Sequence, residues 1–346
     1  MMKSFIKKYN TLRRNKLLNN PLFNTKKNYA FIGAGMHSLS NLYPVLIHYN
    51  ITIKYICTSS GKVLLPLRKH FPNCIFTNNI QDILNDAEVE AVFVCSDPET
   101  HFNIVNMLAK AGKKIFIEKP PCQTQEELET LLKITDLSIC KVGLQRRYWA
   151  GNKSIFKKIK SAKSYTYKFL FGTYPNGNPY TELFIHALDY CSFLFGRFTV
   201  ASFSKQEYEG GLTVHIHAVH DNGITALIEM STHFSWNNPS DVLTINCSEE
   251  IITAQYPISV KGTKRPARFF NLPTERVLNQ PETIKEYFSS GNFVMPVKEM
   301  NTLVLQGFYK ELETFILLAE SENNVWDAND LKGLTDLYKI LHTLQQ

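Results

Sequence analysis

The stretch of residues 91–121 constrains the fold more strongly than any other part of the chain. Ala91–Cys95 is an apolar, β-branched run with the length of a buried strand, and Lys114–Ile117 is a second such run. Apolar residues recur at helical spacing between them, so the stretch predicts a strand, a helix and a parallel strand. Lys119 follows the second strand at its carboxyl end. Because open α/β sheets bind ligands beyond the carboxyl ends of their strands, we expect Lys119 to meet a ligand.

The same alternation extends to both sides of this stretch and predicts an α/β fold. Further strands are expected at Tyr29–Ile32, Ile51–Cys57, Cys74–Phe76 and Ser138–Gly143. Six strands alternating with helices predict a doubly wound parallel sheet over residues 28–147. A chain of 346 residues exceeds the usual limit of a single core, so we expect a second domain over residues 148–346. Strand-like runs follow there at Phe198–Phe203, Leu212–His220, Ile224–Phe234, Asp241–Cys247 and Ile251–Tyr256.

A glycine-rich turn follows the first strand and predicts a dinucleotide site. The segment reads Gly33-Ala-Gly35-Met36-His37-Ser38, one glycine short of the dinucleotide-binding fingerprint. Gly33 permits a tight turn, and Gly35 lets a pyrophosphate approach the backbone. The helix that begins near Met36 directs its N-terminal amides at the anion, next to His37. Ser38 is small enough to replace the third glycine.

The end of the second strand bears on the choice of cofactor. It reads Thr58-Ser59-Ser60-Gly61-Lys62 and lacks the acid that holds the ribose hydroxyls in NAD-binding folds. The hydroxyl donors Thr58 and Ser59, with Lys62 nearby, suit a 2′-phosphate better than a free hydroxyl. We therefore expect NADP or NAD, with NADP preferred; the alternative is a solvated loop with a relaxed preference.

Composition narrows the functional class. No apolar run reaches the length of a membrane span, so no membrane span is expected. Seven cysteines without a CxxC pair suggest reduced thiols and a cytoplasmic protein, and no signal peptide is visible. The net charge of +7 arises in a basic arm, residues 1–27, which holds eight Lys and Arg and no acid, so the other residues sum to −1.

The basic arm allows two interpretations. It could bind nucleic acid or anionic lipid. We favour an arm that packs on its own domain or on a partner subunit, so nucleic acid is not an expected partner. Its apolar anchors would be Phe5, Ile6, Leu12, Leu17, Leu18 and Leu22.

Taken together, these motifs resemble the glucose–fructose oxidoreductase / inositol dehydrogenase (Gfo/Idh/MocA) family. The resemblance rests on GAG at 33–35, the turn Pro98–His101, AGK at 111–113, EKP at 118–120 and Arg146-Arg147. It covers residues 28–346 and leaves the basic arm outside. It implies an N-terminal Rossmann domain and a C-terminal α+β domain with a large, mostly antiparallel sheet. The open face of that sheet commonly forms subunit interfaces, so a homodimer or homotetramer is expected.

The resemblance also implies hydride transfer at C4 of a nicotinamide, to or from a sugar, inositol or related polyol carbon. Glu182, His186 and Asp189 lie at helical spacing and can share one face. The family's pattern here is D-x-G-x-H-x-x-D, so Glu182 and Phe184 replace the usual Asp and Gly. A histidine suits removal of a hydroxyl proton. We expect catalysis by Lys119, His186 and Glu182; for His186, a core helix histidine is the alternative.

Other site residues are expected from their positions in these motifs. The remaining cofactor-binding candidates are Cys95, Ser96, Pro98, His101, Glu118, Lys119, Pro120 and Arg147. The substrate candidates are Tyr148, Asn176 and Asp189. Arg146 and Arg147 could instead form an interdomain salt bridge, and the Lys119–Pro120 bond is a candidate for the cis form. No metal is expected, because no Cys or carboxylate at ligand spacing joins His215 and His217.

The sequence therefore predicts an NAD(P)-dependent oxidoreductase that acts on a sugar, cyclitol or nucleotide-sugar carbon. In this hypothesis His186 exchanges the hydroxyl proton, Lys119 polarises the oxygen and Glu182 orients them. The departures at Glu182 and Phe184 leave an alternative, a non-catalytic cofactor-binding sensor or assembly protein on the same fold. Residues 269–301 carry proline and polar residues and are expected to form an excursion over the active site or into a neighbouring subunit.

Overall fold

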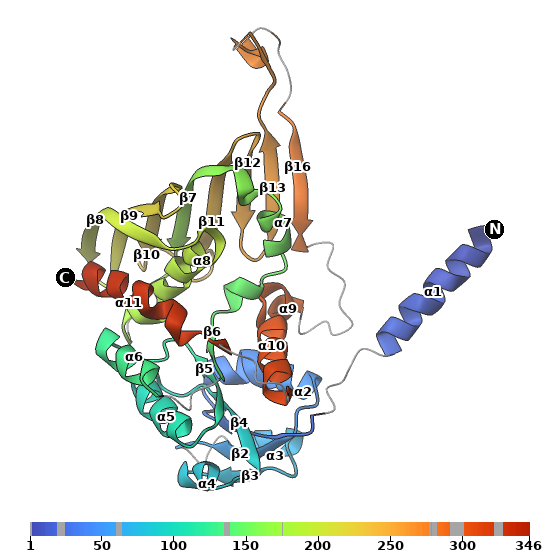
Figure 1. The fold of residues 1–346 in the computed structure, drawn as a ribbon, viewed down its shortest axis with the longest axis vertical. Coiled ribbons are helices and arrows are strands. Elements are labelled where there is room, and N and C mark those ends of the chain that lie inside the picture. The colour runs from blue at the N-terminus through green and yellow to red at the C-terminus, as the bar shows by residue number, and fades with distance from the viewer. Residues whose placement is uncertain are drawn as a thin grey trace.

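The computed structural model of the chain describes residues 2–18, 25–59, 64–134, 139–174, 176–270, 272–276, 278, 282–290, 301–321 and 328–346. Its first layer is a parallel sheet with the strand order β17-β6-β5-β4-β1-β2-β3 (Figure 1). The strands are β1 (Asn28–Ile32), β2 (Ile53–Cys57), β3 (Ile75–Thr77), β4 (Val89–Val94), β5 (Lys114–Glu118), β6 (Ile139–Gly143) and β17 (Ala328–Asn329). The six predicted strands and the doubly wound parallel sheet are confirmed. The chain reverses its direction of progress between β1 and β4, and ligands bind at such a switch point.

Helices cover both faces of this sheet because its strands are apolar on both faces. Along β1, Tyr29 and Phe31 face one core, which includes Phe315, whereas Ala30 and Ile32 face the other. The helices are η1 (Ser38–Leu42, a π-helix), α2 (Tyr43–His48), α3 (Leu64–His70), α4 (Gln81–Leu84), α5 (Pro98–Lys110), α6 (Gln125–Leu132), α9 (Asn301–Gln306) and α10 (Phe308–Glu320). The described elements α9, α10 and β17 thus return to the first sheet, although they follow the strands of the second domain in the chain.

The second layer is an eight-stranded sheet with the order β16-β13-β12-β11-β7-β10-β9-β8. Its strands are β7 (Ala162–Leu170), β8 (Phe198–Tyr208), β9 (Gly211–His220), β10 (Thr225–Ser231), β11 (Ser240–Cys247), β12 (Glu250–Gln255), β13 (Ser259–Lys264) and β16 (Ile284–Ser289). Only the β7–β10 pair is parallel, so the mostly antiparallel sheet is confirmed. α8 (Ile185–Phe195) and α11 (Leu331–Gln345) pack on one face of this domain, and the other face is open (Figure 1).

Short elements complete the chain. They are the helices η3 (Gln145–Tyr148), α7 (Asn152–Phe156), η4 (Ile159–Ser161), η5 (Tyr180–Phe184, a π-helix) and η6 (Thr274–Arg276), with the strands β14 (Arg268–Phe269) and β15 (Leu272–Pro273). β14 and β15 lie beyond the ends of β13 and β16, at the end of the molecule opposite the first sheet (Figure 1). The described part of the expected excursion therefore does not cover the switch point.

The basic arm forms a helix whose described apolar side chains do not pack on its own domain. α1 (Met2–Leu18) is a helix that stands apart from both sheets (Figure 1). Phe5, Ile6 and Leu12, which were expected as anchors, are largely exposed. Packing of these three residues on their own domain is therefore wrong, because no core reaches them. Leu17 and Leu18 have no described side chains, and Leu22 lies outside the described residues. Among the described helices, none combines the length and the apolar character needed to cross a bilayer.

Candidate functional site

A cleft of about 830 Å³ opens above the carboxyl ends of β1, β2 and β4. The structure brings together most of the predicted cofactor residues here. Those that line the cleft are Gly33, Gly35, Met36, His37, Thr58, Ser59, Cys95 and Ser96. Lys62 lies outside the described residues. Ala34, Asn78, Asn103, Ile104 and Met107 also line it and were not singled out from the sequence. They come from loops and from the exposed side of α5, where no motif marks them.

The two glycines explain why this cleft can take a dinucleotide. Gly33 has a φ of +109°, and a Cβ at this position would overlap the carbonyl oxygen of Cys95. The backbone N–H of Gly33 donates to Cys57 O at 2.9 Å, and the Tyr43 hydroxyl donates to Gly33 O at 2.9 Å. A Cβ on Gly35 would meet no atom within 4 Å, so its backbone faces open space in the cleft. Only glycine leaves room for a phosphate at both points.

Lys119 directly follows β5, and its side chain reaches the second domain. The Lys119–Pro120 peptide bond is cis, as the sequence suggested. The Nζ atom of Lys119 donates to the backbone carbonyl of Glu182 at 2.6 Å. Burial lowers the pKa of Lys119, and the negative charges of Glu118 and Glu182 offset this only in part. A partly desolvated ammonium in this position can polarise an oxygen or exchange a proton.

His101 supports the loop that carries Lys119. Its Nδ1 lies 2.7 Å from the Pro120 carbonyl oxygen, and its Nε2 lies 3.2 Å from the carbonyl oxygen of Ser96. The ring is buried, and burial lowers its pKa. His101 therefore joins the turn after β4 to the turn after β5. The residues that line the cleft do not include His101, Pro98 or Pro120, which were all predicted to bind the cofactor.

Glu118 lies beside His37, which is one of the residues that line the cleft. Nε2 of His37 lies 3.3 Å from Oε1 of the buried Glu118. Burial by itself would raise the pKa of Glu118, but the charges of His37 and Lys119 outweigh it and lower the pKa. Glu311 on α10 is also buried, and neither of its carboxylate oxygens has a hydrogen-bond partner among the described residues. Burial and the negative charge of Glu118 raise the pKa of Glu311 well above its ordinary value.

The three predicted residues of the second domain do not form one hydrogen-bonded triad. The Glu182 carboxylate turns toward the loop before it, where it accepts from the Tyr174 hydroxyl and from the Asn178 backbone N–H, each at 2.8 Å. Its backbone carbonyl, not its carboxylate, contacts Lys119. Glu182 ends up here because residues 180–184 are π-helical rather than α-helical. The orientation that we expected from the Glu182 carboxylate is thus supplied by its main chain.

His186 lies in the first turn of α8 and is buried. Its Nδ1 atom has no hydrogen-bond partner within the described part of the chain. Burial, and then the positive charges of Arg146 and Lys119, hold its pKa well below the ordinary value. His186 is therefore a neutral imidazole with one nitrogen able to accept a proton, next to the charge of Lys119.

The two arginines join the domains. Arg146 donates to Oδ2 of Asp241 from Nε at 3.1 Å and from Nη2 at 2.9 Å. Arg147 donates to both carboxylate oxygens of Asp189, at 2.9 and 2.5 Å. Arg147 had been predicted to bind cofactor and Asp189 to bind substrate; in this structure each is the ion-pair partner of the other. The interdomain salt bridge, our alternative for these arginines, is what the geometry contains.

The remaining substrate candidates lie at the edge of the site. Tyr148 is partly buried, and burial raises the pKa of its hydroxyl. Asn176 is exposed in the loop before η5. An aromatic rim was missed: Tyr174 neighbours Trp236, whose Nε1 donates to Thr173 O at 2.8 Å and whose ring is half exposed. No local signal in the sequence marked Trp236, which lies 62 residues from Tyr174 in the chain.

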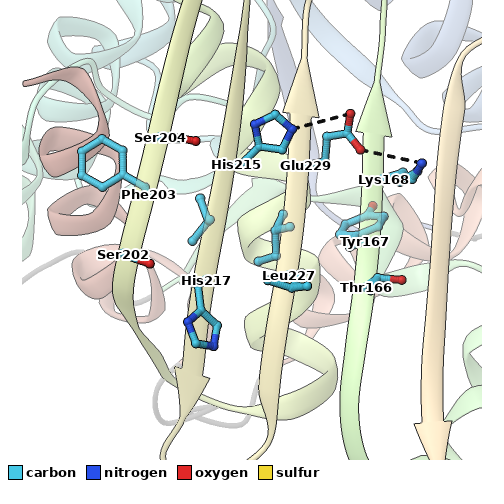
Figure 2. A pocket seen from close by; sticks show the side chains of 12 residues that line it. Thr166, Tyr167, Lys168, Ser202, Phe203, Ser204, His215, His217, Leu227 and Glu229 are labelled. Carbon is cyan, nitrogen blue, oxygen red and sulfur yellow. Dashed lines mark ion pairs between the residues drawn. The ribbon is translucent and has the colours of Figure 1, made fainter.

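A second depression, of about 480 Å³, lies on the open face of the large sheet, away from the cleft (Figure 2). Figure 2 shows His215 and His217 on β9 pointing out of this face, with Leu227 and Glu229 on the next strand. His215 and Lys168 both approach Glu229, at 3.9 and 3.8 Å. Over the described residues, no three His, Cys, Asp or Glu side chains converge as a metal site would require.

Comparisons with known proteins fit this geometry. Residues 27–144 match the model of the Gfo/Idh/MocA oxidoreductase family, which has an NAD-binding Rossmann fold. The chain is 32% identical over 95 residues to inositol 2-dehydrogenase from Paracoccus denitrificans, covering 27% of this chain and 28% of that protein. It is 28% identical over 137 residues to scyllo-inositol 2-dehydrogenase (NADP(+)) from Bacillus subtilis, covering 39% of this chain and 36% of that protein.

A solved structure extends the likeness to the second domain. A dehydrogenase from Chromobacterium violaceum has a TM-score of 0.77 at 17% identity, covering 92% of this chain and 93% of the other. This shows a shared fold over nearly the whole chain. The sequence matches to curated relatives span only about a quarter to a half of the length of those proteins.

Proposed function

The chain belongs to the Gfo/Idh/MocA family of oxidoreductases, and we propose that it is an NAD(P)-dependent dehydrogenase or reductase of a sugar, cyclitol or nucleotide-linked sugar. One observation carries this proposal. Lys119, at the end of β5, is fixed to the backbone of Glu182 beside the neutral His186, and the glycine-lined cleft lies on the same edge of the sheet. A cation, a proton acceptor and a dinucleotide cradle are the parts that alcohol oxidation requires.

The cleft residues fit a nicotinamide dinucleotide. Gly33 and Gly35 would hold its pyrophosphate, and Thr58 and Ser59 would hold the adenosine ribose. Neither residue of that ribose pair is acidic, which supports our proposal that NADP is preferred. When bound, the nicotinamide supplies the hydride acceptor or donor. The seven cysteines are all free thiols, which supports our proposal of a cytoplasmic location.

The chain's own residues would carry the proton and the charge. Lys119 polarises the reacting oxygen, since its ammonium is partly desolvated and held in place by the Glu182 carbonyl. His186 accepts the hydroxyl proton during oxidation and returns it during reduction, because its Nδ1 atom has no hydrogen-bond partner among the described residues. The Arg146–Asp241 ion pair joins the two domains and so would hold Lys119 and His186 in a fixed relative position. Phe184 is buried in the core, where its ring lies edge-on to that of Tyr180 with the centroids 5.7 Å apart.

The experiment follows the absorbance of the reduced nicotinamide with a panel of inositols, free sugars and nucleotide-linked sugars. Lys119→Ala should lower kcat by about 10²–10³-fold, the effect of removing one preorganised charge donor. Glu182→Gln should lose much less, because the backbone carbonyl that holds Lys119 remains. Lys110→Ala, an exposed lysine on α5, is the matched control. Near-normal turnover by Lys119→Ala would contradict the catalytic role that we propose for Lys119.

The alternative is a cofactor-binding protein without catalysis. The diversion of the Glu182 carboxylate toward Tyr174 favours it, since this acid does not contact His186 or Lys119. The same assay separates the two functions. Tight cofactor binding with no turnover across the whole panel would favour a sensor or assembly role.

We also propose that the open face of the large sheet forms a homodimer or homotetramer interface. Leu227 and Phe203 are exposed there, at 59% and 38%, beside the depression shown in Figure 2. Leu227→Asp should convert the oligomer to monomer in size-exclusion chromatography with light scattering, whereas Thr225→Asp at the end of the same strand should change it less. A wild-type monomer would refute the proposal.

A further inference from the structure

The helix α1 has an unpartnered apolar stripe. Phe5, Tyr9 and Leu12 recur at spacings of four and three residues, and Ile6 lies beside them, so all four share one face. Their exposed fractions run from 49% to 74%. Figure 1 shows α1 away from both sheets, so no core covers this stripe. Four large apolar side chains along one helix face form a surface that water solvates poorly.

The opposite face of α1 is polar, and the helix is cationic. Ser4, Lys7 and Thr11 lie on that face at helical spacing, and Lys8 lies at its border. Residues 2–18 include six Lys and Arg and no Asp or Glu. Beyond the helix the chain is anchored: the Lys26 backbone N–H donates to Glu320 at 3.0 Å, and Nζ of Lys27 lies 2.5 Å from Glu90. The cationic helix is therefore attached to the body through residues near 26.

We propose that α1 is a membrane-surface anchor that lies in the headgroup region of a bilayer rich in anionic phospholipid. An amphipathic helix with Lys and Arg on its polar side and aromatic and leucine side chains on the other adopts this position. The anionic cytoplasmic leaflet attracts each Lys or Arg near its surface. The enzyme body would then sit beside the membrane without a spanning segment.

Charge and apolar character together favour lipid over the other partners. Nucleic acid would pair with the lysines and arginines but would leave Phe5, Ile6 and Leu12 exposed to water. A second copy of this chain could cover the stripe, but residues 28–346 sum to −1 and offer no large acidic excess to match the six cations of the helix. An anionic bilayer satisfies both faces of the helix at once.

The test is co-sedimentation of the full chain with vesicles of phosphatidylcholine alone and of phosphatidylcholine mixed with phosphatidylglycerol. We expect binding to the mixed vesicles only, weakened by added salt. Phe5→Ser combined with Leu12→Ser should lower the partition coefficient roughly tenfold or more, and so should Lys7→Gln combined with Lys8→Gln. Asn10→Gln, a polar change on the same helix, should leave binding unchanged. The thermal unfolding midpoint of each variant shows that the body remains folded.

Three results would overturn the proposal. The first is that the wild-type chain fails to sediment with the mixed vesicles. The second is that the Phe5 and Leu12 changes leave vesicle binding intact but dissociate an oligomer in size-exclusion chromatography, which would assign the stripe to a second copy. The third is that the arm retards RNA in a gel while vesicles do not bind. None of these readouts depends on enzymatic activity, so the proposal stands or falls separately from the proposed function.

Discussion

Replacing Arg146 with methionine should destabilise the protein far more than the loss of an ordinary surface ion pair. Arg146 makes two hydrogen bonds to Asp241, and its guanidinium lies 4.7 and 5.0 Å from the ring centroids of Tyr256 and Phe169. Methionine fills similar space, but it leaves the buried Asp241 carboxylate without its cation, and the Tyr167 hydroxyl still donates to that carboxylate at 2.7 Å. Removing one member of a buried pair costs about 3–5 kcal/mol. We expect about 3 kcal/mol, since Tyr167 still solvates the carboxylate.

Urea titrations followed by circular dichroism measure this change in the free energy of unfolding. A loss of about 3 kcal/mol should move the midpoint by about 1 M or more. Lys310→Met is the matched control, because Lys310 pairs with Glu313 at 2.6 Å but is exposed; its loss should cost no more than about 0.5 kcal/mol. Arg146→Met combined with Asp241→Asn should be less destabilised than the single change, since no charge is left alone. Equal midpoints for Arg146→Met and Lys310→Met would refute the reasoning.

Three further results are expected. Glu311→Gln should raise the free energy of unfolding at about pH 7 by about 1 kcal/mol. Burial raises the pKa of Glu311, so the contribution of this carboxyl group to stability is present below about pH 4.5 and is lost as the pH rises. A lower unfolding temperature of the variant in thermal melts would contradict this. Burial lowers the pKa of His220, so the contribution of this histidine to stability is present above about pH 6.5 and is lost as the pH falls. His220→Gln should therefore reduce the loss of unfolding free energy below about pH 6.5. An unchanged dependence of the unfolding free energy on pH would contradict this. Gly33→Ala should abolish nicotinamide binding, since Gly33 combines positive φ with contact to Cys95, whereas Gly223→Ala, with positive φ but open space, should retain it.

The glycine-lined cleft could be predicted from sequence because its signals are local. The turn at Gly33 and the position of Lys119 each follow directly from a strand, and strand ends in a doubly wound sheet meet at one edge. The family resemblance is confirmed, and so is the fold class. Cofactor preference and the roles of individual residues stay predictions.

The candidate residues of the second domain were harder to predict, because their geometry depends on distant contacts and on an irregular helix. Arg146 meets Asp241, 95 residues away, and no local pattern pairs them. The π-helical turn at Tyr180–Phe184 rotates the Glu182 carboxylate away from the face that regular α-helical spacing predicts. β7 was not predicted, although it alternates buried and exposed residues, and β17 is only two residues long. The exposure of Phe5, Ile6 and Leu12 could not be predicted, because an amphipathic pattern shows that a helix has an apolar face, but not what covers it; packing of the arm on a partner subunit stays a prediction.

The most direct test of the oxidoreductase proposal is a titration of the purified chain with NADPH and with NADH, following nicotinamide fluorescence. We predict a saturable change with both, and tighter binding of NADPH, because no acid follows β2 to hold a free ribose hydroxyl. Absence of a saturable change with either cofactor would contradict the assignment of the glycine-lined cleft as a nicotinamide site.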